Sequence, residues 1–268
     1  MFPTELIKYI RKSDVILEVL DGREPELTRS IKLEEIALRY NKKLVLVMNK
    51  SDLVPPTVIK KWIQIYENQG LITIPYSIKK NENTKILKRG IKSLQSKEKI
   101  KCILVGYPKT GKSSIINSLK GYKSTKVSPI PRGTGSTLQI QLFKISGGLY
   151  IWDSPGVIPP DGSPLERIIR GTPPEKLENP VKVAVELIRR ITGLGFKHRL
   201  QRKYNVVFST ELELIEGIAK KRHLIYSKDK ELNIDEASRV LLRDFYNNEI
   251  FYYDLPPTIN LLEKRRRL

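Results

Sequence analysis

Cysteine, histidine and long apolar runs are all scarce in this chain of 268 residues. A single cysteine, Cys102, excludes an internal disulfide, and its place inside an apolar run predicts ordinary core packing. The two histidines, His198 and His223, have no cysteine or second histidine beside them, which argues against a metal site built on them. No run approaches the ~20 apolar residues that a membrane helix needs, and the N-terminus lacks a signal-peptide pattern. These absences predict a cytoplasmic protein with no membrane segment.

Acidic residues are also few compared with basic ones. The chain has 49 Lys and Arg against 29 Asp and Glu, a formal net charge of +20. Residues 71–140 alone hold 13 more basic than acidic residues, whereas residues 161–268 contribute only +5. An excess of this size favours a polyanionic partner. The alternative is that these lysines lie on solvated helix faces and bind no partner.

The strongest motif lies where an apolar run at residues 102–105 leads into a glycine-rich turn. Residues 106–113 fit G-x-x-x-x-G-K-[ST], with a helix expected to begin at Lys112. Gly106 and Gly111 let backbone N–H groups face an anion, and the helix N-terminus adds partial positive charge. Lys112 would reach the outer phosphates of a nucleotide, and Ser113 would hold Mg²⁺. The alternative is a turn without ligand, which a shorter glycine pattern would favour. The predicted phosphate-binding residues are Gly106, Tyr107, Pro108, Lys109, Thr110, Gly111, Lys112, Ser113 and Ser114.

Three apolar runs precede this motif, at residues 15–20, 43–48 and 71–76, and each is expected to be a strand. A helical pattern covers residues 28–40. The second strand runs directly into N-K-x-D, formed by Asn49, Lys50 and Asp52, which is an arrangement that reads guanine. Asp52 would accept from the ring N1–H and the exocyclic amine, a pattern that adenine does not offer. Asn49 would bond the other edge of the base, and the Lys50 stem would cover one face.

The third strand delivers a loop that could present a backbone amide to guanine O6. This loop consists of Ser77, Ile78 and Lys79. Either short motif alone could be a polar loop. Together with the phosphate loop, they make guanine the expected base and GTP or GDP the expected ligand.

Downstream of the phosphate loop, residues 120–136 are rich in Gly, Pro, Ser and Lys and read as a mobile segment. A further strand at residues 149–152 ends in D-x-P-G. There Asp153 would hold a Mg²⁺ water and the Gly156 amide would touch the γ-phosphate. An ordinary turn is the alternative.

These motifs resemble the GTPase superfamily, but the two base-reading motifs precede the phosphate loop. That order is the mark of circularly permuted GTPases, and the chain is most similar to the YlqF/YawG family. The stretch DGREP at residues 21–25 looks like that family's entry motif, and residues 171–191 look like its linker into a second domain. The resemblance implies an α/β fold whose permuted P-loop GTPase domain, residues 1–174, has a mostly parallel sheet with helices on both faces. A smaller, mainly helical RNA-binding domain would occupy residues 175–268.

The family also implies a function. Its members act on the large ribosomal subunit during assembly, so the expected partner is ribosomal RNA or a precursor of that subunit. The family further implies a switch threonine that would bind Mg²⁺ and the γ-phosphate, here Thr134 or Thr137, and Thr134 is preferred because it follows Pro-Arg-Gly. One position departs from the family pattern. Lys109 stands where the family commonly has an Asn that helps hold K⁺, which argues against K⁺ activation. Val157 stands where Ras-like proteins carry a glutamine, so intrinsic hydrolysis should be slow, and no catalytic residue is assigned.

The C-terminal region is expected to be helical, with Asn179 and Pro180 starting one helix and further helices near residues 211–219 and 235–246. Basic clusters lie between them, including Arg199, Arg202 and Lys203, and are typical of RNA contacts or of solvated surfaces. Two hypotheses follow. The chain is a monomeric, GTP-hydrolysing assembly factor, or it is a GTP-gated RNA-binding module without catalysis.

Overall fold

The chain divides into two compact units, and each is described by itself. The structure is a computed structural model that describes residues 3–79, 81–120, 125–126, 141–145, 147–153, 158–226 and 231–257. Within these residues, the first unit runs to Pro159 and includes residues 255–257, and the second is Pro160–Asp254. The domain boundary expected between residues 174 and 175 stays a prediction.

The first unit is built on a seven-stranded sheet with the order β3-β2-β1-β4-β7-β6-β5. Six of these strands run in the same direction, while β6 is antiparallel to both of its neighbours, β7 and β5. Every residue of the first strand is buried, as suits its mainly apolar sequence, and this includes the two carboxyl side chains of Glu18 and Asp21. The strands are β1 (Val15–Asp21), β2 (Lys43–Asn49), β3 (Ile72–Pro75), β4 (Ile100–Val105), β5 (Thr125–Lys126), β6 (Gln141–Lys144) and β7 (Leu149–Asp153).

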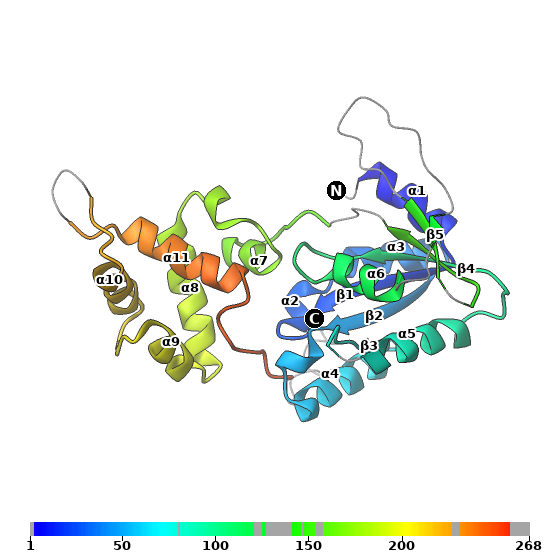
Figure 1. Ribbon diagram of the computed structural model, residues 1–268, viewed down its shortest axis with the longest axis horizontal. Coiled ribbons are helices and arrows are strands. Elements are labelled where there is room, and N and C mark those ends of the chain that lie inside the picture. Colours follow the sequence, from blue (N-terminus) through cyan, green and yellow to red (C-terminus); the bar gives the residue numbers. More distant parts are fainter. Residues whose placement is uncertain are drawn as a thin grey trace, which may run out of the picture. The chain divides into compact units, whose positions relative to one another are not determined.

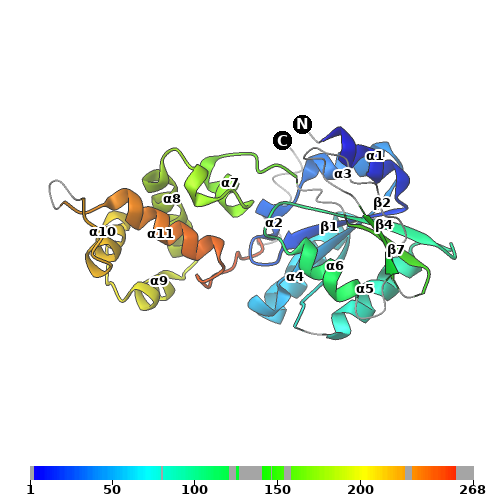
Figure 2. The same cartoon turned by 45° about the horizontal axis from the view of Figure 1, so that its top comes forward.

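Helices cover both faces of this sheet, as Figures 1 and 2 show. The helices are α1 (Thr4–Lys12), α2 (Pro25–Thr28), α3 (Ile31–Arg39), α4 (Pro56–Asn68), α5 (Asn81–Ser93) and α6 (Lys112–Lys120). On one face, α5 and α6 bury Leu87 and Ile115 against alternate residues of β1, β2 and β4. On the other face, α1 and α3 bury Ile10 and Leu33. The alternation of side chains along each strand therefore supplies both cores.

The helix expected over residues 28–40 is divided in two. It is interrupted at Arg29 and Ser30, and Ser30 becomes the N-cap of α3 by accepting from the backbone N–H of Leu33. The backbone N–H of Ser30 in turn donates to the buried Glu18 carboxyl at 2.6 Å. A side chain from the middle of β1 thus sets where the second helix begins.

The second unit is helical. Its helices are α7 (Pro164–Ile169), α8 (Pro180–Gly193), α9 (Lys197–Tyr204), α10 (Glu211–Lys221) and α11 (Ile234–Tyr246). Asn179 caps α8 and Pro180 is its first residue, as expected. Apolar faces of α8, α10 and α11 pack together around Leu187, Ile215 and Leu241, all fully buried. The predicted α/β class with C-terminal helices is confirmed.

Candidate functional site

The predicted ligand-binding loops all leave the same edge of the sheet. Because β1, β2, β3 and β4 are parallel and in register, the residues that follow Asp21, Asn49, Pro75 and Val105 lie at their shared carboxyl ends. The chain runs outward from β1 to β3 and then returns to β4 on the other side of β1. This reversal of strand order between β1 and β4 is where α/β sheets bind ligands.

The phosphate loop joins β4 to α6 in the expected conformation. Gly106 and Gly111 have φ of 152° and 98°, and Lys109 between them has φ of 62°. A Cβ at Gly106 would lie 2.5 Å from the Val19 carbonyl oxygen, so only glycine lets this loop start so close to β1. The helix begins at Lys112, where the sequence predicted it. The loop therefore points backbone amides and a helix N-terminus at one place.

Lys112 lies over this loop. Its Nζ donates to the carbonyl oxygens of Gly106 at 2.8 Å and Tyr107 at 2.5 Å. Burial lowers the pKa of the Lys112 amine to about 7. The side chain is therefore placed inside the loop before any ligand binds, and the phosphates of a nucleotide would stabilise its charged form.

The guanine motif is joined directly to the phosphate loop. Asn49 is buried, and its Nδ2 donates to the Thr110 carbonyl oxygen at 2.7 Å. A Cβ on Gly111 would lie only 2.1 Å from the same Nδ2. The other amide atom, Asn49 Oδ1, is buried with no hydrogen-bond partner among the described residues. The amide thus braces the phosphate loop, and its oxygen keeps the capacity to accept from a ligand.

Asp52 is held by the third loop. Its Oδ1 accepts from Ser77 Oγ at 2.7 Å, and its Oδ2 lies 3.1 Å from Lys79 Nζ. Burial raises the pKa of the Asp52 carboxyl, but the bond from Ser77 and the charge of Lys79 outweigh it and hold that pKa below its usual value. Asp52 is therefore an ionised acceptor, which is the state that reading a guanine edge requires.

A second carboxylate, which the sequence analysis left without a role, organises Lys50. Asp21 ends β1 beside Asn49, and its Oδ2 accepts from Lys50 Nζ at 2.7 Å and from Arg23 Nη2 at 2.8 Å. Burial raises the pKa of Asp21, and the cations of Arg23 and Lys50 lower it well below its usual range. Lys50 itself has a left-handed backbone, with φ of 59°. Asp21 thus fixes the side chain that should cover the base.

Comparisons with known proteins agree with this geometry. The family model of the RsgA GTPase matches residues 24–161, and that of the 50S ribosome-binding GTPase matches residues 101–227. The chain is a circularly permuted GTPase of the YlqF/YawG-like family.

Two curated relatives and one solved structure illustrate the similarity. The GTP-binding protein MJ1464 of Methanocaldococcus jannaschii is 34% identical over 251 residues, which cover 92% of this chain and 65% of that protein. Nucleolar GTP-binding protein 2 of Saccharomyces cerevisiae is 31% identical, covering 98% of this chain and 55% of its own length. GDP-bound YlqF of T. maritima superposes with a TM-score of 0.66 at 22% identity, covering 94% of this chain and 98% of that one, and so supports the fold. This GTPase therefore spans about half to two thirds of the two curated relatives.

Several predicted ligand-contacting residues fall outside the described part of the GTPase. These are Thr134, its alternative Thr137, and Gly156, together with Val157 at the glutamine position. Asp153 ends β7, which pairs with β4 as far as Ile103 and Trp152, so its backbone lies at the same edge as the phosphate loop. Ser113 and Ser114 are exposed in the first turn of α6. The glycine-rich loop and the Lys112 amine together fit a nucleotide phosphate, whereas the spare Asn49 oxygen can only accept from a donor group of a ligand.

The predicted RNA residues of the second unit differ in their surroundings. Arg202 is exposed, but the Arg199 guanidinium lies 4.8 Å from the centre of the Phe251 ring. Lys203 pairs with Glu249 at 3.0 Å and Asp244 at 3.4 Å. Two members of this cluster therefore stabilise their own unit. No helix in the described ranges has the length and apolar character to cross a membrane.

Proposed function

We propose that this GTPase binds GTP with Mg²⁺, hydrolyses it, and acts in assembly of the large ribosomal subunit by binding its RNA in a nucleotide-dependent way. The observation that carries the proposal is the Asn49 to Thr110 bond, which couples a guanine-reading loop to a phosphate loop. The matching family description, a 50S ribosome-binding GTPase, supports the partner. A net charge of +20 supports attraction to RNA.

The chain's own residues would divide the work of binding. Asp52 and Asn49 would read the base, Lys50 would cover it, and the backbone amides from Gly106 to Ser114 with Lys112 would hold the phosphates. Ser113, Thr134 and Asp153 would hold Mg²⁺, which neutralises charge that develops on the phosphates during transfer. The Gly156 amide would contact the γ-phosphate.

Hydrolysis by the isolated protein should be slow. Val157 has no group that could orient a water, and no catalytic residue is assigned among the described ones. Lys109, exposed in the phosphate loop, brings a fixed positive charge where an activating K⁺ would otherwise be needed. We therefore expect the ribosomal particle to supply the missing catalytic contact to a cytoplasmic monomer.

Phosphate release under multiple turnover tests this proposal. The protein is incubated with GTP and Mg²⁺ alone and with purified large-subunit particles, and RNA affinity is measured with a non-hydrolysable GTP analogue and with GDP. We expect release to accelerate with particles and RNA to bind more tightly in the analogue state. Nucleotide-dependent RNA binding without any turnover would instead identify a non-catalytic GTP-gated module. Equal RNA affinity in both nucleotide states would refute the gate.

A further inference from the structure

Three short segments meet at the amino ends of the strands, opposite the nucleotide loops. They are residues 11–14, 39–43 and 97–101, and we call the surface they form the basic edge. The backbone N–H of Asp14 donates to the Lys101 carbonyl at 2.7 Å, and Lys42 Nζ donates to the Arg11 carbonyl at 2.7 Å. Val15 and Lys43 are paired in the register of β1 and β2. These contacts place all three segments side by side.

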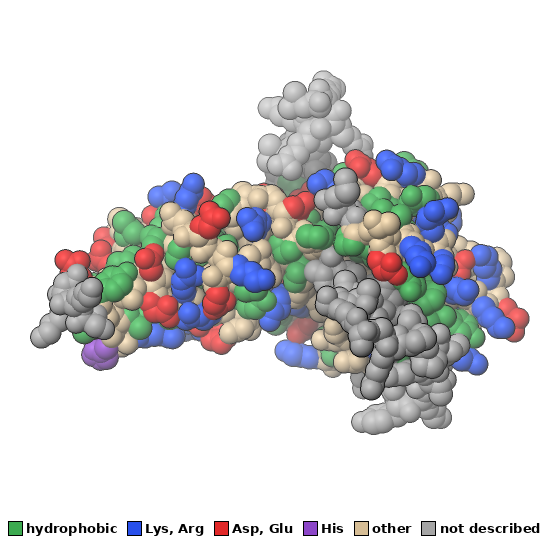
Figure 3. Space-filling view, turned by 90° about the horizontal axis from the view of Figure 1, so that it is seen from above, with side chains coloured by type: hydrophobic (Ala, Val, Ile, Leu, Met, Phe, Trp, Pro, Cys, Tyr) green, Lys and Arg blue, Asp and Glu red, His purple; other side chains and the backbone are tan. Residues whose placement is uncertain are grey.

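The basic edge carries a concentrated positive charge. Its segments contain eight Lys and Arg residues against two acidic residues, Asp14 and Glu98. Asp14 is already engaged, because it pairs with Lys97 at 2.6 Å and accepts from the Lys101 N–H at 2.8 Å. Figure 3 shows Lys and Arg side chains gathered over this end of the GTPase unit.

Helix ends account for only part of this charge. Arg11 and Lys12 lie in the last turn of α1 and Arg39 in the last turn of α3, where cations complement the helix dipole. Lys43 and Lys99, however, begin or precede strands, whose dipoles are small. Arg39, Lys43 and Lys99 are exposed, and within the described ranges none of them has an acidic partner. Most of the ion-paired cations among the described residues lie elsewhere, as at Asp21.

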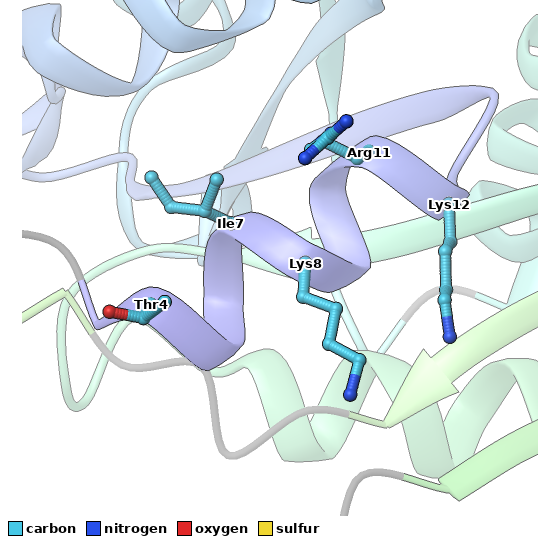
Figure 4. A pocket seen from close by; sticks show the side chains of 5 residues that line it. All are labelled: Thr4, Ile7, Lys8, Arg11 and Lys12. Carbon is cyan, nitrogen blue, oxygen red and sulfur yellow. The ribbon is translucent and has the colours of Figure 1, made fainter.

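A groove along α1 continues the basic edge. The groove has a volume of about 460 Å³. Figure 4 shows Lys8 and Lys12 extending from the same side of the helix. The described residues that line it are Thr4, Ile7, Lys8, Arg11 and Lys12, with no acidic member. The Arg11 guanidinium also lies 5.6 Å from the centre of the Tyr40 ring, so a flat cationic surface adjoins the groove.

We infer that the basic edge is a second RNA-binding surface of this protein, which takes the phosphate backbone of the large-subunit RNA. The inference rests on the proposed function for the identity of the RNA. The cations lie at the amino ends of three neighbouring strands, which together span about 10 Å, and this spread suits a chain of phosphates better than a single anion. The guanidinium of Arg11 over Tyr40 offers a plane on which an unpaired base can stack.

The distance between the basic edge and the nucleotide loops predicts how RNA binding at this surface should depend on the nucleotide. The seven residues of β2 separate it by about 20 Å from the nucleotide loops at the other end of the strands. The surface should therefore strengthen RNA binding equally with GTP and with GDP. Nucleotide dependence would come from other parts of the protein.

A triple variant tests the basic edge. Arg39→Gln, Lys43→Gln and Lys99→Gln together remove three exposed charges, and RNA affinity is measured from 50 to 200 mM salt in both nucleotide states. The salt slope should fall by about 2 to 3, and affinity near 100 mM salt by up to ~100-fold. GTP affinity and melting temperature should stay as in the wild type.

The matched control removes the same charge elsewhere. Lys60→Gln, Lys61→Gln and Lys85→Gln are exposed substitutions in the early turns of α4 and α5. An equal loss of salt slope and RNA affinity in this control would overturn the inference, because the attraction would then depend on total charge and not on the basic edge. An unchanged slope in the edge variant, with normal wild-type RNA binding, would also overturn it, as would polyglutamate competing as well as RNA. Failure of the wild type to bind large-subunit RNA would instead refute the proposed function.

Discussion

Gly111 is the position at which a single methyl group should disrupt the contact between the phosphate loop and Asn49 of the guanine motif. Gly111 has φ of 98°, a conformation that L side chains rarely adopt. A Cβ there would lie 2.1 Å from Asn49 Nδ2, far inside contact distance. In Gly111→Ala, either the loop or the Asn49 side chain must therefore move.

The size of the effect follows from two contributions. A non-glycine residue held at such a φ costs about 1–3 kcal/mol. Displacing Asn49 breaks its 2.7 Å bond to the Thr110 carbonyl in a buried place, which costs about 1–3 kcal/mol more. The sum, about 2–6 kcal/mol, is a large part of the 5–15 kcal/mol typical of a folded domain. If the loop relaxes instead of unfolding, the same energy appears as a loss of GTP affinity of about 30-fold or more.

Gly70→Ala is a matched control for this variant. Gly70 has φ of 80°, but a Cβ there meets nothing within 4 Å. Gly70→Ala therefore measures the cost of backbone strain without a steric clash like the one between Gly111→Ala and Asn49. The assay is titration with a fluorescent GTP analogue in Mg²⁺, together with thermal unfolding of each variant. Gly111→Ala should weaken GTP binding, whereas Gly70→Ala should lower stability alone.

A double variant isolates the contact with Asn49. Asn49→Ala removes the atom that the new methyl group would meet, so Asn49→Ala with Gly111→Ala should lose less affinity than the sum of the two single losses. Normal GTP affinity in Gly111→Ala would refute the reasoning. Strict additivity in the double variant would show that the 2.1 Å approach does not couple the two residues.

Three further predictions concern ionisable groups. Asp52→Asn should shift preference from guanosine toward xanthosine triphosphate, since an amide can donate to xanthine O2; competition binding tests this, and retained preference for GTP contradicts it. Lys112 has a pKa of about 7 in the free protein, which phosphates would raise, so GTP binding above pH 7 should take up a proton and weaken by at most tenfold per pH unit. Calorimetry in buffers of different ionisation enthalpy detects this uptake, which Lys112→Gln should abolish; its persistence in that variant assigns it elsewhere. Burial raises the pKa of Glu18 to about 8, so the folded state holds an extra proton between pH 4.5 and 8 and stability falls as pH rises through that window. Glu18→Gln should flatten this dependence and raise the melting temperature at pH 8; an unchanged pH profile would contradict the assignment.

Local patterns were enough to predict the nucleotide loops. The start of α6 at Lys112 and the position of Asn49 at the end of β2 both follow from a few neighbouring residues, because strand, turn and helix preferences are local. Parallel register then brings the loops together whatever their order in the chain. A circular permutation moves the chain ends but leaves these neighbours unchanged.

Contacts between distant side chains could not be predicted in the same way. The pairing of Lys50 with Asp21 spans 29 residues and depends on the register of β1 against β2. From the sequence alone, Ser30 is expected inside a helix. It becomes an N-cap because its backbone N–H donates to the Glu18 carboxyl, a contact that only the fold reveals. Likewise, Lys203 and Arg202 look equivalent in the sequence, yet Lys203 pairs with carboxylates and Arg202 is exposed.

A further contact between distant residues, from Ile158 to the phosphate loop, bears on how the nucleotide state could reach the second unit. The backbone N–H of Ile158 donates to the Gly106 carbonyl oxygen at 3.3 Å, and the Ile158 side chain is buried in the core beside Tyr107. The same carbonyl accepts from Lys112 Nζ at 2.8 Å. If phosphates draw the Lys112 amine away, the Gly106 carbonyl loses one of its two donors, and its bond to Ile158 must change in strength. Because Ile158 stands two residues before the second unit begins at Pro160, this carbonyl is a physical link between phosphate binding and the segment that leads into the helical unit.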